Sequence, residues 1–151
     1  AVALARFAQR GVAAHRLVWR GKAAPAEFVR WMDEVDIALD SYPLNGGTTT
    51  MEALWMGVPV LSLTGQRFFA RAGKSILSAA GFPRWATNTE EDFIREAQAL
   101  AADLPALAGL RRNLRGQIQR SPLCDARGFT RAFEAVCRAA WQDWCARTAQ
   151  K

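Results

Sequence analysis

The chain has 151 residues, of which 50% are hydrophobic and 23% charged, so it is long enough for one globular domain and too apolar for a disordered protein. No apolar run approaches the roughly 20 residues that cross a bilayer, which argues against a membrane protein. The net charge is +6, but the arginines are scattered and aromatic residues do not alternate with them. A solvated surface is therefore favoured, and charge-driven nucleic-acid binding is the minor alternative.

The N-terminal part of the chain alternates predicted helices and strands. Residues 2–10 have a helical pattern that ends at Gly11, a typical C-cap position. The run RLVWRG, residues 16–21, predicts a short buried strand, and DIALD, residues 36–40, predicts a second one. Pro25 suits the first turn of the helix between them. Because the chain begins without Met and without a signal-peptide pattern, we expect it to be a piece of a longer protein.

Two more strands are predicted downstream. The run VPVLSLTG, residues 58–65, predicts the third strand, and Trp85 and Ala86 mark one more short strand. Between them, residues 68–81 predict a helix that closes at Gly81. Strands that alternate with helices of about ten residues imply a parallel sheet with right-handed crossovers. The predicted fold class is α/β.

From residue 89 onward the chain is predicted to be helical. Thr89 and Asp92 resemble a capping box at the start of one helix. Two further helices are each indicated by apolar residues on one face, namely Leu107, Leu110, Leu114 and Ile118, and then Phe129, Phe133, Val136, Ala140 and Trp144. We predict one domain over residues 1–151, with an α/β part over 1–88 and a helical tail over 89–151.

The cysteines and the single histidine do not form a metal-binding pattern. Cys124, Cys137 and Cys145 contain no CxxC pair, and His15 has no ligand cluster around it. The sequence therefore predicts no structural zinc site. Reduced thiols in a cytoplasmic protein are favoured over disulfides.

The run NGGTTTME, residues 45–52, lies between a predicted strand and a predicted helix. Ligands of parallel α/β sheets bind beyond the carboxyl ends of the strands, where this run falls. Gly46 and Gly47 let another group approach the backbone, and the free amides at a helix start suit a phosphate or diphosphate. Glu52 follows one turn later, where it could accept hydrogen bonds from a ribose. The alternative is a plain capping box, in which Glu52 folds back onto the helix N-cap.

The run DIALDSYPLNGGTTTMEALWMGVPVLSLTG, residues 36–65, closely resembles the catalytic C-terminal region of the O-linked N-acetylglucosamine transferase and SPINDLY family of protein glycosyltransferases. The similarity extends through residues 15–40, 68–82, 110–124 and 133–145. The residues GGTTT followed by EALWMGVP are most similar to the bacterial SPINDLY-type branch. The resemblance implies a GT-B architecture with two Rossmann-like lobes. This chain would be most of the C-terminal, donor-binding lobe, and the other lobe and tetratricopeptide repeats would precede it in the same protein.

The resemblance also implies which residues hold a nucleotide-sugar donor. The matching diphosphate-binding positions are Gly46, Gly47, Thr48 and Thr49, and the ribose-binding position is Glu52. Where animal members have a histidine, this chain has Gly47, so that side-chain contact is absent and backbone amides carry more of the binding.

The base-binding segment of the family matches residues 22–31. Ala23 matches a position whose backbone meets the base, while Phe28 and Trp31 replace polar residues of the family. Stacking on the base and packing in the core both remain open for these two aromatic side chains, so uridine and guanosine remain open as well.

Arg71 matches an arginine found in many members. Two roles remain open for it, namely offsetting the charge of the donor and pairing with Glu52 or Asp40. Asp40 itself is interpreted as an anchor for the tight turn, not as a catalytic base.

The activity implied by the resemblance is inverting, metal-independent transfer of N-acetylglucosamine from UDP-GlcNAc to Ser or Thr of an acceptor protein. The implied partners are therefore the nucleotide sugar and the acceptor, with no cofactor, no metal, no nucleic acid and no membrane. The alternatives are a GDP-fucose-using transferase of the same family and a non-catalytic nucleotide-binding or interaction module. No catalytic residue is assigned within this chain, and we expect the chain alone to have little or no transferase activity.

Overall fold

A computed structural model describes residues 2–148 of the chain. Its centre is a parallel sheet of three strands, β1 (Ala38–Leu39), β2 (Val60–Leu63) and β3 (Ala86–Thr87), in the order β1-β2-β3. Ala38 lies opposite Val60, and Ser62 lies opposite Ala86. These strands confirm the parallel α/β prediction for three of the four predicted strands.

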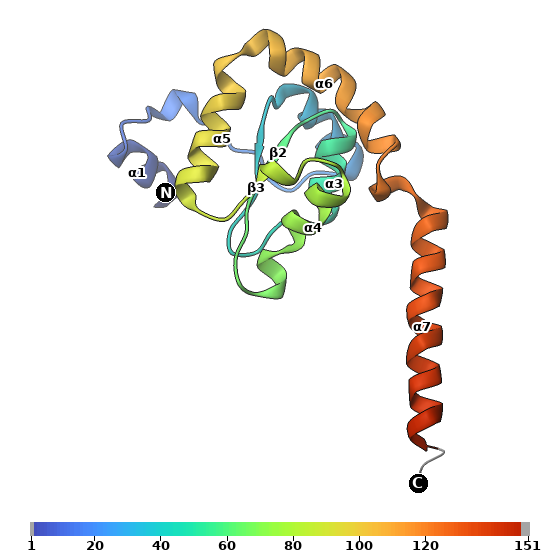
Figure 1. Cartoon of the computed structure of the whole chain (residues 1–151). Coiled ribbons are helices and arrows are strands. Elements are labelled where there is room, and N and C mark those ends of the chain that lie inside the picture. The colour runs from blue at the N-terminus through green and yellow to red at the C-terminus, as the bar shows by residue number, and fades with distance from the viewer. Residues whose placement is uncertain (1, 149–151) are drawn as a thin grey trace.

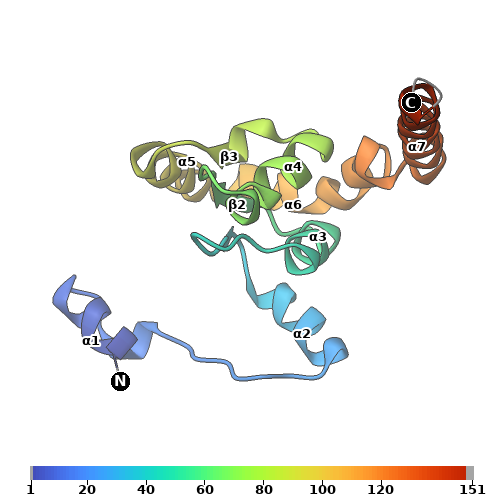
Figure 2. The ribbon, with the colours of Figure 1, turned by 90° about the horizontal axis from the view of Figure 1, so that it is seen from below.

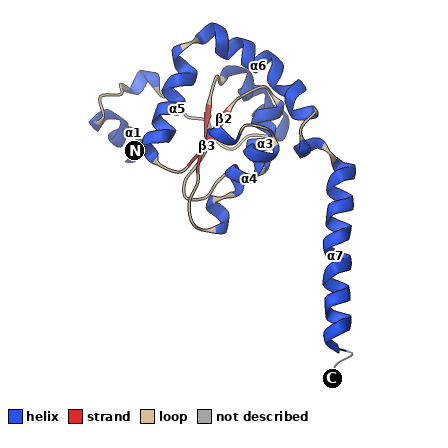
Figure 3. Ribbon diagram, viewed as in Figure 1, coloured by secondary structure: helices blue, strands red, loops and turns tan. Residues whose placement is uncertain are grey.

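Helices make up most of the remaining chain (Figure 3). The α-helices are α1 (Val2–Gln9), α2 (Pro25–Trp31), α3 (Thr48–Trp55), α4 (Ala72–Ala79), α5 (Glu90–Ala102), α6 (Leu104–Gln119) and α7 (Ala126–Thr148). Short 3₁₀ helices are η1 (Ala14–Arg16), η2 (Met32–Glu34), η3 (Phe68–Ala70), η4 (Pro83–Trp85) and η5 (Pro122–Cys124). Figure 1 shows α5 on one side of the strands and α3 and α4 on the other, with α6 passing over the top.

The core lies between the sheet and these helices. Its fully buried large side chains include Leu54 of α3, Leu61 of β2, Leu77 of α4, Trp85 of η4 and Leu114 of α6. The predicted apolar face of residues 107–118 is confirmed, since Leu107, Leu114 and Ile118 are buried and Leu110 packs against the cluster. Burial of apolar surface is the main stabilising contribution to such a domain.

The helix ends follow the local signals. Gly11 (φ +76°) and Gly81 (φ +90°) end α1 and α4 in the left-handed conformation that glycine adopts without strain. At the start of α5, the Thr89 hydroxyl accepts a hydrogen bond of 3.1 Å from the Asp92 amide. The predicted C-caps and the predicted N-cap are therefore confirmed.

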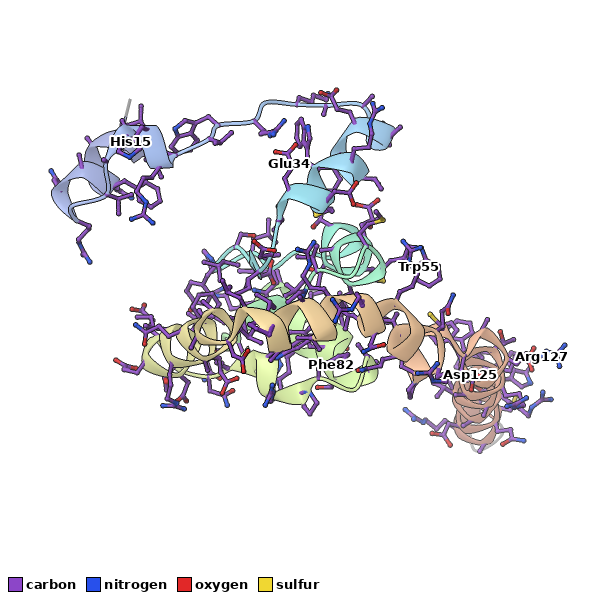
Figure 4. All side chains as sticks on the ribbon, turned by 90° about the horizontal axis from the view of Figure 1, so that it is seen from above. His15, Glu34, Trp55, Phe82, Asp125 and Arg127 are labelled. Carbon is purple, nitrogen blue, oxygen red and sulfur yellow. The ribbon has the colours of Figure 1, made fainter. Side chains whose placement is uncertain are left out.

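The strand predicted over residues 16–21 is wrong. This segment is extended but lies outside the sheet, and the side chains of Val18 and Trp19 are 78% and 58% exposed (Figure 2). An apolar run forms a strand only where a neighbouring strand supplies hydrogen bonds, and none of the described strands lies beside it. Instead, Arg20 bonds Glu34 of η2, which lies between the segment and the rest of the molecule (Figure 4).

The helix predicted over residues 68–81 is interrupted. Residues 68–70 form η3, and α4 begins after Arg71. The carbonyl oxygen of Ala70 accepts a hydrogen bond of 2.8 Å from the Gly65 amide. Because this carbonyl bonds the loop after β2, the first turn is tied to the sheet and does not continue as a regular helix.

The last helix, α7, projects away from the rest of the molecule (Figure 1). None of its residues between 126 and 148 is buried, and it packs chiefly against η5. Its apolar face remains uncovered, with Phe129, Phe133, Val136 and Trp144 all exposed. None of the helices within residues 2–148, α7 included, has an apolar window long enough to span a membrane.

Candidate functional site

The site predicted at the start of α3 is an uncapped helix N-terminus. Gly47 is the N-cap, and no side chain accepts a hydrogen bond from the first turn. The first helical bond is a 3.2 Å contact from the Met51 amide to the Gly47 carbonyl oxygen, and Thr48 and Thr49 are exposed. Within residues 2–148, the amides of Thr48 and Thr49 make no hydrogen bond to the protein. Such amides, at the positive end of the helix dipole, are suited to bind an anion.

The capping-box alternative is wrong. It requires a threonine at the N-cap and Glu52 three residues later, but the helix begins at Thr48 and Glu52 falls in its second turn. Within the described part of the chain, the Glu52 carboxylate accepts no hydrogen bond, and its side chain is half-buried. Glu52 therefore does not cap the helix.

Asp40 anchors the turn, as interpreted from the sequence. Its Oδ1 accepts hydrogen bonds from the amides of Gly46 (2.7 Å) and Ser41 (2.9 Å). Its Oδ2 accepts a bond of 2.8 Å from the hydroxyl of Ser62 on β2. One carboxylate thus fixes both ends of the loop between β1 and α3 to the neighbouring strand, so its oxygens hold the loop and Ser62 instead of taking part in a proton transfer.

Asn45 is a site residue that the sequence analysis missed. Its side chain is 7% exposed, and its Nδ2 donates to the carbonyl oxygens of Ser41 (3.0 Å) and Leu63 (3.3 Å). Its Oδ1 accepts from the Gly73 amide (3.4 Å), and its own amide donates to the Phe69 carbonyl oxygen (3.1 Å). Asn45 therefore joins the glycine–threonine turn, residues 46–50, to the end of β2 and to the start of α4.

A groove of about 450 Å³ lies beside the turn. Its lining brings together Phe28 of α2, Gly46 and Thr49, together with Asp40 and Leu39. The structure thus places one of the three predicted base-binding residues next to two of the predicted diphosphate-binding residues. Phe28 is half-buried, which leaves part of its ring on the groove.

The other two predicted base-binding residues do not line this groove. Trp31 packs edge-to-face against Phe28, with ring centroids 6.2 Å apart, and Arg20 lies over its indole at 5.2 Å. Ala23 lies on the extended segment before α2.

Arg71 lies at the N-cap of α4 and is exposed. The predicted alternative of an ion pair with Glu52 or Asp40 is wrong for residues 2–148, in which neither pair forms. Arg71 instead lines a second groove with Phe68 and Lys74. The structure therefore does not bring Arg71 into the groove of Thr49.

Residues 110–116 hold three arginines close together in the sequence, and two of them have partners within the protein. Arg111 bonds Asp36, and the Arg115 Nε donates to the Trp55 carbonyl oxygen at 2.6 Å, at the C-terminal end of α3. The Arg115 guanidinium also lies 5.4 Å from the centre of the Trp55 ring, at the edge of α3 (Figure 4). The Arg115 contacts fix α3 against α6, and the Arg111 contact fixes α6 against the segment before β1, so these two arginines serve the fold.

Gly73 packs too closely on the Asp40 network to accept a side chain. A Cβ at this position would lie 2.0 Å from the Ser62 Oγ and 3.0 Å from the Asp40 Oδ2. We expect Gly73→Ala to lower the free energy of unfolding by about 1–3 kcal/mol, because the buried neighbours must move. Urea unfolding of the variant measures this.

The matched control is Gly109→Ala in α6. There the nearest atom to an added Cβ is the Arg112 Nη2 at 3.8 Å. Because alanine is the better helix former, this variant should gain about 0.5–1 kcal/mol. Equal stability of the two variants would contradict the close packing at Gly73.

Comparisons with known proteins match nearly the whole chain. Residues 1–133 match the model of Glycosyl transferase family 41. Over 111 residues, 74% of this chain, it is 40% identical to a protein of Oryza sativa subsp. japonica named probable UDP-N-acetylglucosamine–peptide N-acetylglucosaminyltransferase SPINDLY. Over 134 residues, 89% of this chain, it is 29% identical to the UDP-N-acetylglucosamine–peptide N-acetylglucosaminyltransferase of Caenorhabditis elegans. The matched region is 12% of the length of each of these relatives.

A solved structure matches as well. The chain superposes on an O-GlcNAc transferase mutant of Thermobaculum terrenum with a TM-score of 0.87 and 35% identity, over 97% of this chain and 28% of that one. This match confirms the expected fold class, a Rossmann-like parallel sheet with flanking helices that is part of a GT-B lobe.

Proposed function

The chain belongs to glycosyl transferase family 41, and from this premise we propose that it is the donor-binding part of a protein O-glycosyltransferase. The proposed reaction moves N-acetylglucosamine from UDP-GlcNAc to Ser or Thr hydroxyls of an acceptor protein. The observation that carries this proposal is the uncapped start of α3 next to a groove that runs along β1 and reaches the turn. The names of the relatives, peptide N-acetylglucosaminyltransferases, support the choice of donor and acceptor.

The proposed role of the glycine–threonine turn is to bind the donor diphosphate. The amides of Thr48 and Thr49 and their hydroxyls donate hydrogen bonds to the phosphate oxygens, and Gly47, where an added Cβ would meet no atom within 4 Å, lets the phosphates approach the backbone. Gly46 supports the site indirectly, because its missing Cβ leaves room for the hydroxyls of Thr49 and Thr50. When the sugar leaves, negative charge grows on the diphosphate. Fixed amide dipoles at a helix end stabilise that charge without reorganising, so the proposal requires no metal and no cofactor.

The proposed nucleoside contacts lie on either side of this turn. Glu52 accepts hydrogen bonds from the ribose hydroxyls, and Phe28 stacks on the base within the groove that it shares with Thr49. Ala23 and Trp31 lie outside that groove, and Trp31 supports the ring of Phe28 through its edge-to-face contact. Since an aromatic face stacks on any base, this arrangement also suits the guanosine of a GDP-fucose donor.

The proposed activity belongs to the longer protein. The chain spans 12% of the length of its named relatives, and we assign no catalytic base to it. The other lobe and the tetratricopeptide repeats are proposed partners within the same protein. We therefore expect binding of donor nucleotide, but no turnover, from residues 1–151 alone.

The proposed location is the cytoplasm. Cys124, Cys137 and Cys145 are all free thiols, and the first two are exposed. Exposed free thiols suit a reducing compartment.

Calorimetric titration with UDP and GDP tests the proposed site. We expect UDP to bind, and Thr49→Ala and Glu52→Ala each to weaken it at least about tenfold, because a hydrogen bond to a charged group contributes about 1.5–3 kcal/mol. The control is Thr130→Ala on α7, where the hydroxyl bonds the Ala126 carbonyl oxygen at 2.8 Å. If GDP bound more tightly than UDP, the proposed donor would be a guanosine diphosphate sugar instead of UDP-GlcNAc. Binding of neither nucleotide would refute the site and leave an interaction module.

A further inference from the structure

A second groove, of about 630 Å³, lies along α4. It is formed by η3, Arg71 and the exposed side of α4. Its lining residues are Phe68, Arg71, Ala72, Lys74, Ser75, Ile76 and Ser78. None of them contributes to the groove that Phe28 and Thr49 share.

This second groove is fixed to the glycine–threonine turn. Asn45 precedes the two glycines of the turn, and its amide bonds the Phe69 carbonyl oxygen while its Oδ1 accepts from the Gly73 amide. Phe69 belongs to η3 and Gly73 to the first turn of α4. Figure 1 shows η3 and the start of α4 at the lower end of the sheet, where β2 leads into the loop before η3. The end of the groove at η3 and Arg71 is therefore tied to the turn that is proposed to bind the donor diphosphate.

The groove carries positive charge from two side chains. Arg71 and Lys74 are exposed, and neither takes part in an ion pair within residues 2–148. No acidic side chain belongs to the lining. Two unpaired cations on one rim attract a negatively charged partner and speed its association.

The remaining lining favours a peptide over a small anion. Phe68 is 93% exposed, an unusual position for a large aromatic side chain, and it sits on η3 at the end of the groove. Ile76 and Ala72 add apolar surface, whereas the hydroxyls of Ser75 and Ser78 can bond backbone amides and carbonyl groups. Exposed aromatic residues with adaptable polar neighbours are typical of recognition surfaces.

We propose that this groove binds an extended, acidic segment of the acceptor protein. Arg71 and Lys74 bond Asp or Glu side chains of that segment, and Phe68 packs against one of its apolar side chains. This proposal rests on the proposed function, because the connection of the groove to the donor-binding turn is what makes its occupant the acceptor. It adds a preference for acceptor sites flanked by acidic residues.

Fluorescence anisotropy with labelled peptides tests the proposal on the whole 151-residue chain. One probe is an acidic peptide with Ser, Glu and a single Phe, and the second carries Lys in place of each Glu. We expect only the acidic probe to bind, with an affinity that falls as salt is raised. Arg71→Glu with Lys74→Glu should weaken binding at least about tenfold, since each reversal turns an attraction into a repulsion. Phe68→Ala should weaken it less, by about fivefold.

The matched control is Arg112→Glu with Arg138→Glu, which changes the net charge by the same amount on α6 and α7 and should leave the affinity unchanged. The proposal would be overturned if the control lost as much affinity for the acidic peptide, or if the lysine probe bound. It would also be overturned if a single-stranded oligonucleotide of equal charge bound more tightly than the acidic peptide. Titration of UDP into the Lys74→Glu variant separates it from the donor site. A chain that binds UDP but not the acidic probe refutes the groove alone, and one that binds the probe but not UDP refutes the proposed donor site alone.

Discussion

Trp85→Ala is expected to lower the free energy of unfolding by about 3–5 kcal/mol, the usual cost of removing a fully buried large aromatic side chain. Trp85 is 0% exposed and stacks on Phe82, with ring centroids 4.1 Å apart and planes within 4° of parallel. It belongs to the core cluster together with Leu77 of α4 and Leu114 of α6, so its removal leaves a cavity in the core. In a domain of this size the unfolding midpoint should fall by about 10 °C, which calorimetry measures.

Trp85→Phe separates the volume of this side chain from its polarity. The indole Nε1 is buried without a hydrogen-bond partner among the described residues. Phenylalanine removes this unsatisfied donor and keeps a ring, so the loss should stay below about 1.5 kcal/mol. Trp19→Ala, at a position where the side chain is 58% exposed, is the control for loss of a tryptophan. A Trp85→Ala variant within about 1 kcal/mol of the parent would contradict this packing.

Asp40→Ala is expected to remove nucleotide binding and to cost about 2–4 kcal/mol of stability. The substitution deletes the acceptors of three hydrogen bonds, from the Ser41 and Gly46 amides and the Ser62 hydroxyl. Each group left unsatisfied in a buried setting costs about 1–3 kcal/mol, and Ser62 is fully buried. Without its anchor the loop no longer holds Gly46 beside Thr49. Urea unfolding and UDP titration measure the two effects.

Two further variants show whether Asp40 acts as an anchor. Asp40→Asn retains one acceptor oxygen and should keep part of the stability and part of the UDP affinity. Asp36→Ala removes an exposed carboxylate that bonds Arg111, and an exposed ion pair contributes about 0–1 kcal/mol. If Asp40→Ala unfolded like Asp36→Ala and still bound UDP, the anchoring role would be excluded.

Local signals predicted much of this fold. The C-caps at Gly11 and Gly81 and the N-cap at Thr89 depend on the conformation of a few adjacent residues, which is why the sequence reveals them. The strand expected over residues 16–21 depends on a neighbour distant in the chain, and its apolar pattern is the same whether or not that neighbour is present. Non-local hydrogen bonding cannot be inferred from such a pattern.

At the site, too, contacts between neighbouring residues could be predicted and contacts between distant elements could not. Asp40 could be interpreted as a turn anchor because an aspartate before a tight turn commonly bonds the backbone a few residues on. Asn45 could not be singled out, because its partners Leu63 and Gly73 come from two other elements. An asparagine before two glycines indicates a turn and nothing more.

The isolation of α7 has a thermodynamic consequence. Since α7 packs chiefly against η5, it gains little from the cooperativity of the sheet and should melt as a separate unit at lower temperature. Helical circular dichroism would then record two overlapping transitions, and a two-state analysis of the whole chain would return an enthalpy that belongs to neither. Fluorescence from Trp141 and Trp144 would report the unfolding of α7, whereas fluorescence from the buried Trp85 would report the unfolding of the globular body.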